Sequence, residues 1–216
     1  MKTILCYGDS NTWGFKVGSW IEETYYFERY TPDVRWTGRL AKLLGKDYHI
    51  IEEGLSGRTT DIVDPDAPYK DGVTYLLPCL RSHVPIDLVI LFLGCNDFKT
   101  QFSRSISQVS KGMEMLVKII QTSKSGNDMI RSPDILIIGY PELVFEEDTN
   151  LAYKGGVEKS KKFDEYYSKL AEKYGCHYLN AAPHVKMSPL DGCHMDEKSH
   201  KIMAEILQEK IVQIYK

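Results

Sequence analysis

The chain alternates short apolar runs with longer stretches in which apolar residues recur three and four positions apart. Short apolar runs between turn signals are typical of buried strands, and the wider spacing is typical of amphipathic helices. The pattern predicts five strands, over residues 3–7, 48–51, 87–93, 135–138 and 176–179. It predicts four helices, over residues 33–44, 106–122, 156–174 and 196–215.

Strands that alternate with helices indicate an α/β fold. Connections between parallel strands are right-handed and place helices on the faces of the sheet, so we expect a three-layer α/β/α sandwich. A polar loop directly after the first strand favours the flavodoxin-like order 2-1-3-4-5 for a five-stranded parallel sheet. No repeat or linker interrupts the pattern, so residues 1–216 are expected to form a single domain.

Two long segments, residues 61–78 and 141–153, show neither a helix pattern nor a strand pattern. Loops of this length in a compact domain are usually functional rims or lids. Both segments follow soon after a strand, so we expect them to flank the same crevice.

Composition narrows the choice of partners and location. The chain is 43% hydrophobic and 26% charged, as in soluble globular proteins, and its net charge of -3 gives no reason to expect nucleic acid or an anionic membrane as a partner. No stretch approaches the roughly 20 apolar residues that cross a bilayer. The first residues also lack the apolar run of a secretory signal, so a cytoplasmic location is expected.

The five cysteines are odd in number and widely spaced, which favours free thiols in a reducing compartment. The adjacent pairs Cys176-His177 and Cys193-His194 look like paired metal ligands. Adjacent residues rarely both reach one ion, however, and the sequence has no Cys-x-x-Cys or His-x-x-x-His spacing. No metal site is therefore expected.

Four polar loops that contain glycine follow the ends of predicted strands. They are Gly8-Asp9-Ser10, Glu53-Gly54-Leu55, Gly94-Cys95-Asn96-Asp97 and Asp191-Gly192-Cys193-His194. In doubly wound sheets, ligands bind at the carboxyl ends of the strands. We therefore expect the four loops to converge on one edge of the sheet.

The residue types in these loops fit acyl transfer by a serine nucleophile. Ser10 can attack a carbonyl carbon, and His194 can take its proton near neutral pH. Asp191, three residues earlier, can hold the imidazole in the required tautomer. Taken alone, Ser10 is more typical of a helix cap and His194 of a solvated loop. The ordered arrival of these residues at one edge favours the catalytic interpretation.

Acyl transfer also needs hydrogen-bond donors that face the developing oxyanion. The backbone N–H groups of Ser10 and Gly54 are candidates, because a glycine lets the main chain approach closely. The side-chain amide of Asn96 is the third candidate. Taken alone, Gly54 and Asn96 are more typical of turns and caps.

The four loops, in this order, resemble the signature blocks of the SGNH (GDSL-type) hydrolases. The stretches ILCYGDSNTWG, DVRWTG, EEGLSGRTT and DLVILFLGCND are most similar to the arylesterase and acyltransferase group of that family. The resemblance implies the α/β/α fold, a triad of Ser10, His194 and Asp191, an oxyanion hole of Ser10, Gly54 and Asn96, and no cofactor. It also implies a homo-oligomer whose packing restricts the substrate channel, and acyl transfer to alcohols or peroxide beside hydrolysis.

Two residues depart from the family pattern. Asn11 stands where the family name has leucine, and Cys95 stands where threonine is commoner. Asn11 adds polarity beside the nucleophile, so we place it among the expected substrate-binding residues. Cys95 joins it there, although packing is the simpler role for its thiol. Trp13 is expected to form an apolar wall that excludes water, with a place in the core as the alternative.

The expected function is that of a serine esterase or acyltransferase. It would act on short-chain aryl or alkyl esters through an acyl-enzyme on Ser10, with a small-molecule ester as partner. Two alternatives remain open: a carbohydrate O-deacetylase with the same triad and a different rim, and a non-catalytic binding module with the same fold.

Overall fold

The structure is a computed structural model that describes residues 1–24, 26–145 and 151–216. Within these ranges, parallel strands form a sheet in the order β2-β1-β3-β4-β5. The bounds are Lys2–Gly8 (β1), Tyr48–Gly54 (β2), Leu88–Phe92 (β3), Asp134–Gly139 (β4) and His177–Asn180 (β5). This order confirms the predicted flavodoxin-like sheet.

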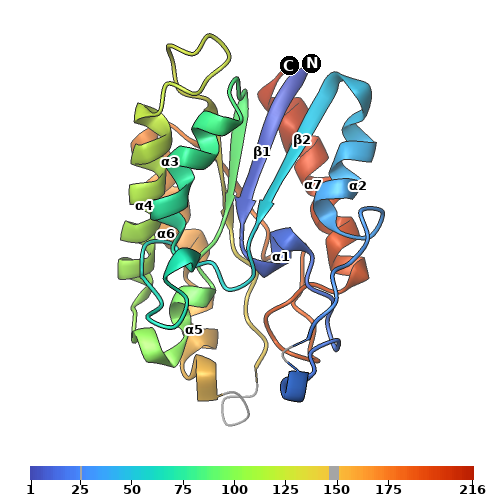
Figure 1. Ribbon diagram of the computed structural model, residues 1–216, viewed down its shortest axis with the longest axis vertical. Coiled ribbons are helices and arrows are strands. Elements are labelled where there is room, and N and C mark those ends of the chain that lie inside the picture. Colours follow the sequence, from blue (N-terminus) through green and yellow to red (C-terminus); the bar gives the residue numbers. More distant parts are fainter. Residues whose placement is uncertain (25, 146–150) are drawn as a thin grey trace.

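Helices cover both faces of the sheet and complete three layers (Figure 1). Helices α2 and α7 pack together on one face, and α3, α4 and α6 lie side by side on the other. The longer helices are Trp36–Leu44 (α2), Gly72–Ser82 (α3), Ile106–Thr122 (α4), Phe163–Tyr174 (α6) and Glu197–Ile214 (α7). The predicted α/β/α sandwich is therefore confirmed.

Short helices lie mostly in the connections beyond the carboxyl ends of the strands. They are Ser10–Trp13 (α1), Glu22–Thr24 (η1), Gly45–Asp47 (η2), Pro68–Lys70 (η3), Asn96–Phe98 (η4), Thr100–Phe102 (η5), Leu151–Tyr153 (η6) and Gly156–Ser160 (α5). None of the helices in the described part of the chain combines the length and the apolar character that crossing a bilayer requires.

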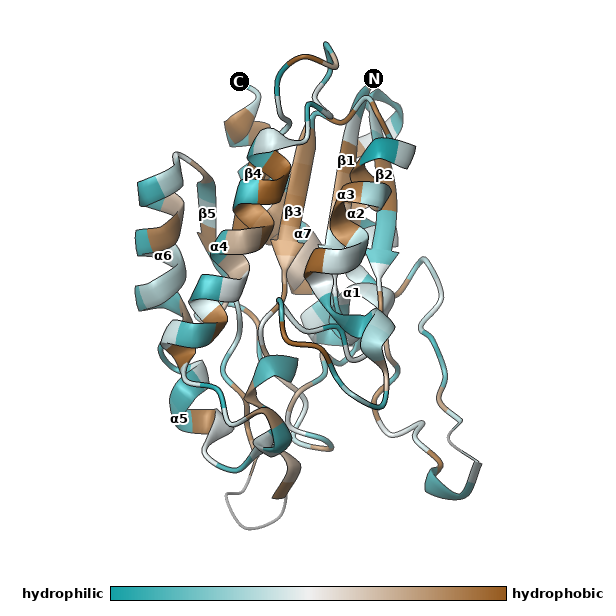
Figure 2. Ribbon diagram, turned by 60° about the vertical axis from the view of Figure 1, so that its left-hand side comes forward, coloured by the Kyte–Doolittle hydropathy of each residue, from teal (hydrophilic) through white to brown (hydrophobic). Residues whose placement is uncertain are grey.

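The central strand β3 shows why the core runs along the sheet. Its five residues are all fully buried, as expected for a parallel strand covered on both faces. Helix α4 buries Val109, Met113 and Leu116 and starts with a capping box formed by Ser105 and Gln108. In Figure 2, β1 and β3 carry the brown colour of hydrophobic residues. The apolar residues of the strands and the apolar faces of the helices thus pack together in one core.

The strand register brings the ends of three strands to one level. Gly8, the last residue of β1, pairs with Gly54 of β2 and with Phe92 of β3. A Cβ at Gly8 would lie 2.0 Å from Thr12 Oγ1, so only glycine lets α1 fold back against the end of β1. The loops after these strands consequently start side by side, as the sequence predicts.

One segment without a predicted element contains part of a helix. Residues 72–78, within the segment 61–78, belong to α3. Asp71 caps this helix, because its Oδ1 accepts a hydrogen bond from Thr74 N at 2.8 Å. Pro78 lies inside α3, and a proline removes a backbone donor and weakens the helical signal of a sequence. The prediction was therefore wrong for residues 72–78, and it contained no helix over the rest of α3.

Other differences concern the ends of elements. The predicted helix 156–174 is two helices, since α5 ends at Ser160 and α6 begins at Phe163. Helix α2 begins at Trp36, because residues 32–34 form a turn before it. In the segment 141–153, residues 141–145 carry no helix or strand and 151–153 form η6, whereas 146–150 lie outside the described residues.

Candidate active site

Ser10 is the first residue of α1, the short helix that follows β1. Asp9 caps this helix, with its Oδ1 accepting a hydrogen bond from Asn11 N at 2.9 Å. This turn holds Ser10 at the carboxyl edge of the sheet, where 5% of the residue is exposed. The serine is thus shielded from bulk water and still lines a pocket.

A chain of hydrogen bonds joins Ser10, His194 and Asp191. Ser10 Oγ lies 2.8 Å from His194 Nε2, and His194 Nδ1 lies 2.8 Å from Asp191 Oδ2. Asp191 Oδ1 also accepts from the backbone N–H of His194 at 3.0 Å. Phe15 stacks on the imidazole, with ring centroids 4.1 Å apart. The ring is therefore held with Nε2 toward the serine hydroxyl, which is the orientation a general base needs.

The loop that carries His194 depends on Gly192. This residue has a φ of +73°, which lies in the left-handed region that favours glycine. A Cβ at this position would also lie 2.2 Å from Phe145 Cδ1. Its carbonyl accepts a hydrogen bond from Val144 N at 2.9 Å. Gly192 thus lets the loop turn tightly between Asp191 and His194.

The charges of the site favour a protonated imidazole. Burial alone would lower the pKa of His194, but the Cys193 sulfur and the Asp191 carboxylate raise it to about 10. The Cys193 Sγ lies 3.5 Å from His194 Nδ1. Burial would raise the pKa of Asp191, but its hydrogen bonds with His194 bring it below its usual range. The pair therefore stabilises an imidazolium beside a carboxylate, the state reached after a base takes a proton.

Asn96 reaches the same pocket from the turn after β3. Its Nδ2 donates to the Arg58 carbonyl at 3.1 Å, and its Oδ1 accepts from the Tyr153 hydroxyl at 3.1 Å. A side-chain amide nitrogen carries two hydrogens. One N–H of Asn96 is therefore left for a ligand in the pocket that this residue lines.

Gly54 lies against the nucleophile turn. A Cβ at this position would lie 2.1 Å from the backbone nitrogen of Trp13. Because α1 approaches so closely, position 54 needs a glycine on packing grounds alone. The close approach also puts the end of β2 beside the turn that carries Ser10.

A pocket of about 870 Å³ opens over Ser10. In Figure 1, the connection after α1 (blue) and the connection after β2 (cyan) lie on either side of α1. The first connection, together with the end of α1, supplies an aromatic wall of Trp13, Phe15, Trp20 and Phe27. A second, more polar wall consists of Leu55, Ser56, Gly57, Tyr69, Lys70, Asn96 and Lys99. Trp13 thus lies in the pocket wall rather than in the core.

Asn11 and Cys95 lie beneath this pocket, and neither lines it. Their exposed fractions are 1% and 2%. Asn11 Nδ2 donates to the Cys193 carbonyl at 2.9 Å, and its Oδ1 accepts from Met195 N at 2.8 Å. Cys95 Sγ contacts the Tyr140 hydroxyl at 3.1 Å. The expected substrate contact is corrected for both residues, because their polar atoms are used by neighbouring segments.

Three aromatic residues complete the site without having been singled out from the sequence. Phe15 stacks on His194, and Tyr153 donates to Asn96. Tyr140 donates to Asp9 Oδ2 at 3.0 Å, beneath the nucleophile turn. Aromatic residues at such positions are more often core residues, so their spacing alone carries no signal for these contacts.

Two groups of side chains in the described ranges offer potential metal-ligand atoms within 4.8 Å of one another. They are Asp191, Cys193 and His194, and Glu53, Cys79 and His83. The first group is bonded as described above. In the second, His83 Nε2 lies 2.9 Å from Glu53 Oε1, and burial raises the pKa of the Cys79 thiol to about 12. Both groups are already bonded internally, so neither requires an ion to satisfy its polar atoms.

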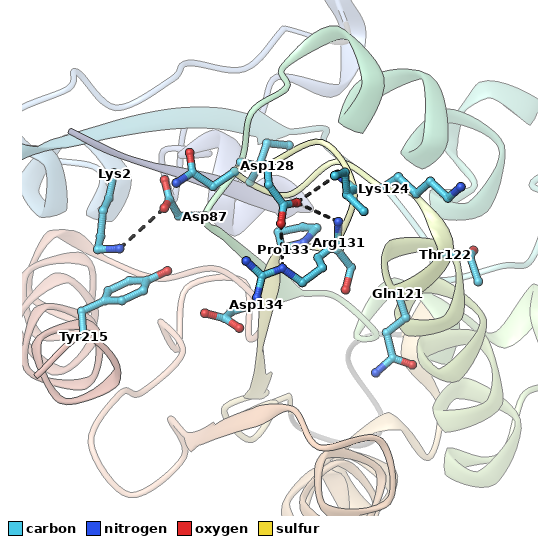
Figure 3. A pocket seen from close by; sticks show the side chains of 14 residues that line it. Lys2, Asp87, Gln121, Thr122, Lys124, Asp128, Arg131, Pro133, Asp134 and Tyr215 are labelled. Carbon is cyan, nitrogen blue, oxygen red and sulfur yellow. Dashed lines mark hydrogen bonds and ion pairs between the residues drawn. The ribbon is translucent and has the colours of Figure 1, made fainter.

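A second pocket, of about 760 Å³, lies at the opposite edge of the sheet (Figure 3). Four of its charged side chains form two ion pairs. Lys2 Nζ lies 3.6 Å from Asp87 Oδ1, and Arg131 Nε lies 2.7 Å from Asp128 Oδ2. Ligand sites of doubly wound sheets lie at the carboxyl ends of the strands. This pocket is therefore separate from the chemistry around the serine.

Comparison with known proteins gives a consistent result. The chain matches the GDSL-like lipase/acylhydrolase family over residues 6–202. An inhibitor-bound aryl esterase from M. smegmatis is 36% identical, with a TM-score of 0.92 and 99% of each chain covered. A carbohydrate acetylesterase from Sinorhizobium meliloti is 34% identical, with a TM-score of 0.92 and coverage of 99% of this chain and 100% of that one. The search of curated proteins gave no match.

A more distant structure shows how widely the fold is shared. A member of the lipolytic G-D-S-L family from Veillonella parvula is 14% identical, with a TM-score of 0.68 and coverage of 99% of this chain and 100% of that one. At this identity the similarity concerns the fold alone. The family match, which spans most of the chain, and the two similar esterases go further and confirm the resemblance seen in the sequence. The chain therefore belongs to the GDSL-like lipase/acylhydrolase family, the SGNH hydrolases.

Proposed function

We propose that this hydrolase is a serine esterase that cleaves short-chain carboxylic esters, aryl or alkyl, through an acyl-enzyme on Ser10. The observation that carries the proposal is the hydrogen-bonded series Asp191–His194–Ser10, with 2.8 Å at both side-chain contacts. The series opens into the 870 Å³ pocket. An aryl esterase at 36% identity supports the same substrate class.

The first step forms the acyl-enzyme. Ser10 Oγ attacks the ester carbonyl carbon while its proton moves to His194 Nε2, and Asp191 stabilises the resulting imidazolium. The carbonyl oxygen becomes an oxyanion, for which the backbone N–H groups of Ser10 and Gly54 and one N–H of Asn96 are the proposed donors. The tetrahedral intermediate then collapses, its bond to the alcohol oxygen breaks, and His194 returns the proton to the leaving alcohol.

The second step releases the acyl group. Water gives a proton to His194 while its oxygen attacks the acyl carbon. The intermediate then collapses, the bond between the acyl carbon and Ser10 Oγ breaks, and His194 returns the proton to Oγ, which frees the acid and restores the serine hydroxyl. The aromatic wall around Trp13 limits the water that reaches the ester. An alcohol or peroxide that occupies the position of this water would take the acyl group instead, so acyl transfer is part of the proposal.

The test replaces the nucleophile. Ser10→Ala is expected to lower kcat for a short aryl acetate by about 10³-fold or more, since removing a triad member leaves only the oxyanion hole and binding. The same variant should lose labelling by a fluorophosphonate probe. Ser107→Ala, an exposed serine on α4, is the matched control and should behave like the wild type. Wild-type hydrolysis by Ser10→Ala would refute the proposal.

A carbohydrate O-deacetylase is the second candidate. Two observations favour it: the carbohydrate acetylesterase at 34% identity, and the aromatic wall, on which a sugar ring could stack. Hydrolysis of a panel of aryl acetates is compared with that of acetylated oligosaccharides. A higher kcat/KM for the oligosaccharides would favour carbohydrate esters over aryl esters as the substrate class. It would not affect the proposed role of the triad.

We further propose that the chain acts as one domain in the cytoplasm. The single sheet and the continuous core of the described residues support the domain assignment. The five cysteines are free, which supports a reducing compartment. A small-molecule ester is the proposed partner, together with further copies of the chain, and neither nucleic acid nor membrane is proposed.

A further inference from the structure

Two lysines, Lys70 and Lys99, line the polar wall of the active-site pocket. We propose that they bind an anionic group on the alcohol part of the substrate, so that the natural ester carries a negative charge there. This inference rests on the proposed esterase function, because it concerns the same pocket. The triad alone does not determine the charge of the substrate, and the inference specifies that the alcohol part is anionic.

The backbone holds Lys70 at the pocket. Its carbonyl accepts a hydrogen bond from Thr59 N at 3.1 Å, which ties η3 to the turn after β2. Its side chain lies across Gly57, where a Cβ would be 3.2 Å from Lys70 Nζ. Gly57 has a φ of +83° and leaves the ammonium room. The buried hydroxyl of Ser56 has no hydrogen-bond partner among the described residues and lies in the same wall.

Lys99 is fixed beside the proposed oxyanion donor. It follows Asn96 by three residues, and its backbone N–H donates to the Asn96 carbonyl at 3.2 Å. The next turn begins at once, because Phe102 N donates to the Lys99 carbonyl at 2.9 Å. Lys99, like Lys70, is half-buried. Two lysines thus line the pocket from two separately anchored turns.

The pocket holds no carboxylate free to neutralise these charges, as far as the structure describes the chain. Among the residues that the structure describes, Asp191 is the only acidic one in the lining, and it is engaged with His194. Described carboxylates form no ion pair with either lysine. Half-buried cations beside a low-dielectric aromatic wall focus a positive potential into the cavity.

Three of the four acidic residues between positions 61 and 71 have partners elsewhere, and the fourth, Asp66, is exposed and does not line the pocket. Asp61 pairs with Arg104, and Asp71 caps α3. Asp64 accepts a hydrogen bond from a backbone N–H within its own turn, at 3.1 Å. The local acidic stretch therefore does not line the pocket, and the positive charge of Lys70 remains available to a ligand.

The size of the pocket assigns the charge to the alcohol part. A cavity of about 870 Å³ is far larger than a short acyl group requires. Because the acyl carbon must lie at Ser10, the remaining space is left for the alcohol part. The aromatic wall suits the ring of this part, and the lysines suit a carboxylate, phosphate or sulfate attached to it.

The experiment compares two acetate esters, 3-acetoxybenzoate and the neutral 3-acetoxybenzamide, on the wild type and on lysine variants. The measured quantity is kcat/KM for 3-acetoxybenzoate divided by kcat/KM for 3-acetoxybenzamide. The two leaving groups differ in chemical reactivity, but this difference contributes equally to the ratio of every variant. In the wild type, the ratio should fall when NaCl is raised from about 50 to 500 mM, because salt screens partly exposed charges.

Lys70→Gln and Lys99→Gln should each lower the ratio about threefold, and the double variant about tenfold, as expected for partly solvated charge pairs. Hydrolysis of the neutral amide should change less than about twofold. Lys99→Arg should keep the ratio. The matched control is Lys124→Gln at the opposite edge of the sheet (Figure 3), which changes the net charge equally and should have no effect.

The outcomes separate the inference from the function on which it rests. A double variant with the ratio of the wild type, while hydrolysis and fluorophosphonate labelling of Ser10 persist, would overturn the inference alone. A wild-type protein that hydrolyses neither ester and is not labelled would overturn the proposed function and the inference together. Unfolding midpoints of all variants in urea confirm that the comparison is between folded proteins.

Discussion

Asn11 links the two chain segments of the proposed catalytic site, which lie far apart in the sequence. It follows Ser10 directly, and its side chain brackets the backbone of His194. Asn11 Nδ2 donates to the carbonyl of residue 193, and its Oδ1 accepts from the N–H of residue 195. The residue on each side of the histidine is thus tied to the nucleophile turn. Asn11 is therefore a positioning residue, since no atom of it needs to touch the ester.

Asn11→Leu tests this role, because it keeps the size and removes both bonds to residues 193 and 195, together with the bond that Nδ2 donates to the Tyr140 hydroxyl. We expect kcat to fall by about 10²-fold with little change in KM, because a small displacement of a catalytic group is costly. The readout is steady-state hydrolysis of a short aryl acetate together with the rate of fluorophosphonate labelling. Asn127→Leu, in the exposed loop at the opposite edge, is the control. An unchanged kcat in Asn11→Leu would contradict the positioning role.

The raised pKa of His194 predicts the pH dependence of the reaction. As a general base, His194 must be neutral, so activity is lost as the pH falls through its pKa. That pKa lies above the usual 6.5, at about 10, since Cys193 and Asp191 outweigh the effect of burial. The acid limb of kcat/KM should therefore lie well above pH 6.5.

Cys193→Ala removes the sulfur at 3.5 Å from the imidazole and should move this limb to lower pH. The measurement is kcat/KM for a short aryl acetate between about pH 5 and 10, corrected for spontaneous hydrolysis. Cys176→Ala, which is remote from the pocket lining, should leave the limb in place. A limb at or below pH 6.5 in the wild type, or no shift in Cys193→Ala, would contradict the assignment.

At the scale of elements, the sequence predicts those parts whose signal is local. Strand β3 is a continuous apolar run, and α4 has both helical spacing and a cap, so both were predicted nearly to their ends. Helix α3 (Gly72–Ser82) was missed over its whole length because Pro78 interrupts its pattern, although Asp71 caps it. The break between α5 and α6 was missed because its polar residues 161 and 162 fit the exposed face of a continuous helix.

The candidate site, like the secondary structure, could be predicted only in part. The convergence of Ser10, Asn96 and His194 could be predicted, because parallel strands bring their carboxyl ends together. The role of Asn11 could not, since its partners lie 182 and 184 residues away in the sequence. A polar residue beside a nucleophile is equally consistent with contact to a substrate or to another loop. Only the packing of the loop that carries His194 against α1 shows that Asn11 contacts another loop.

At the scale of the whole molecule, apolar side chains gather near the mouth of the pocket. Figure 2 shows the connection that contains η1 reaching away from the sheet. In this connection Ile21 is 46% exposed and Tyr26 is 55% exposed. Leu190, 74% exposed, lies close by, because a Cβ at Gly18 would be 3.9 Å from its Cδ1. Exposed apolar patches of this kind mark association surfaces.

We predict that this patch is covered in a homo-oligomer, which would also narrow the entrance to the pocket. Light scattering after size exclusion should give a mass that is a multiple of the 24.8 kDa chain. Ile21→Asp combined with Leu190→Asp should shift the mass toward that of one chain, because association would then bury two unpaired charges. Ile130→Asp, an equally apolar exposed residue at the opposite edge, is the control. A wild type with the mass of a single chain at micromolar concentration would contradict the prediction, and a changed mass in the control alone would place the contact at the other edge of the sheet.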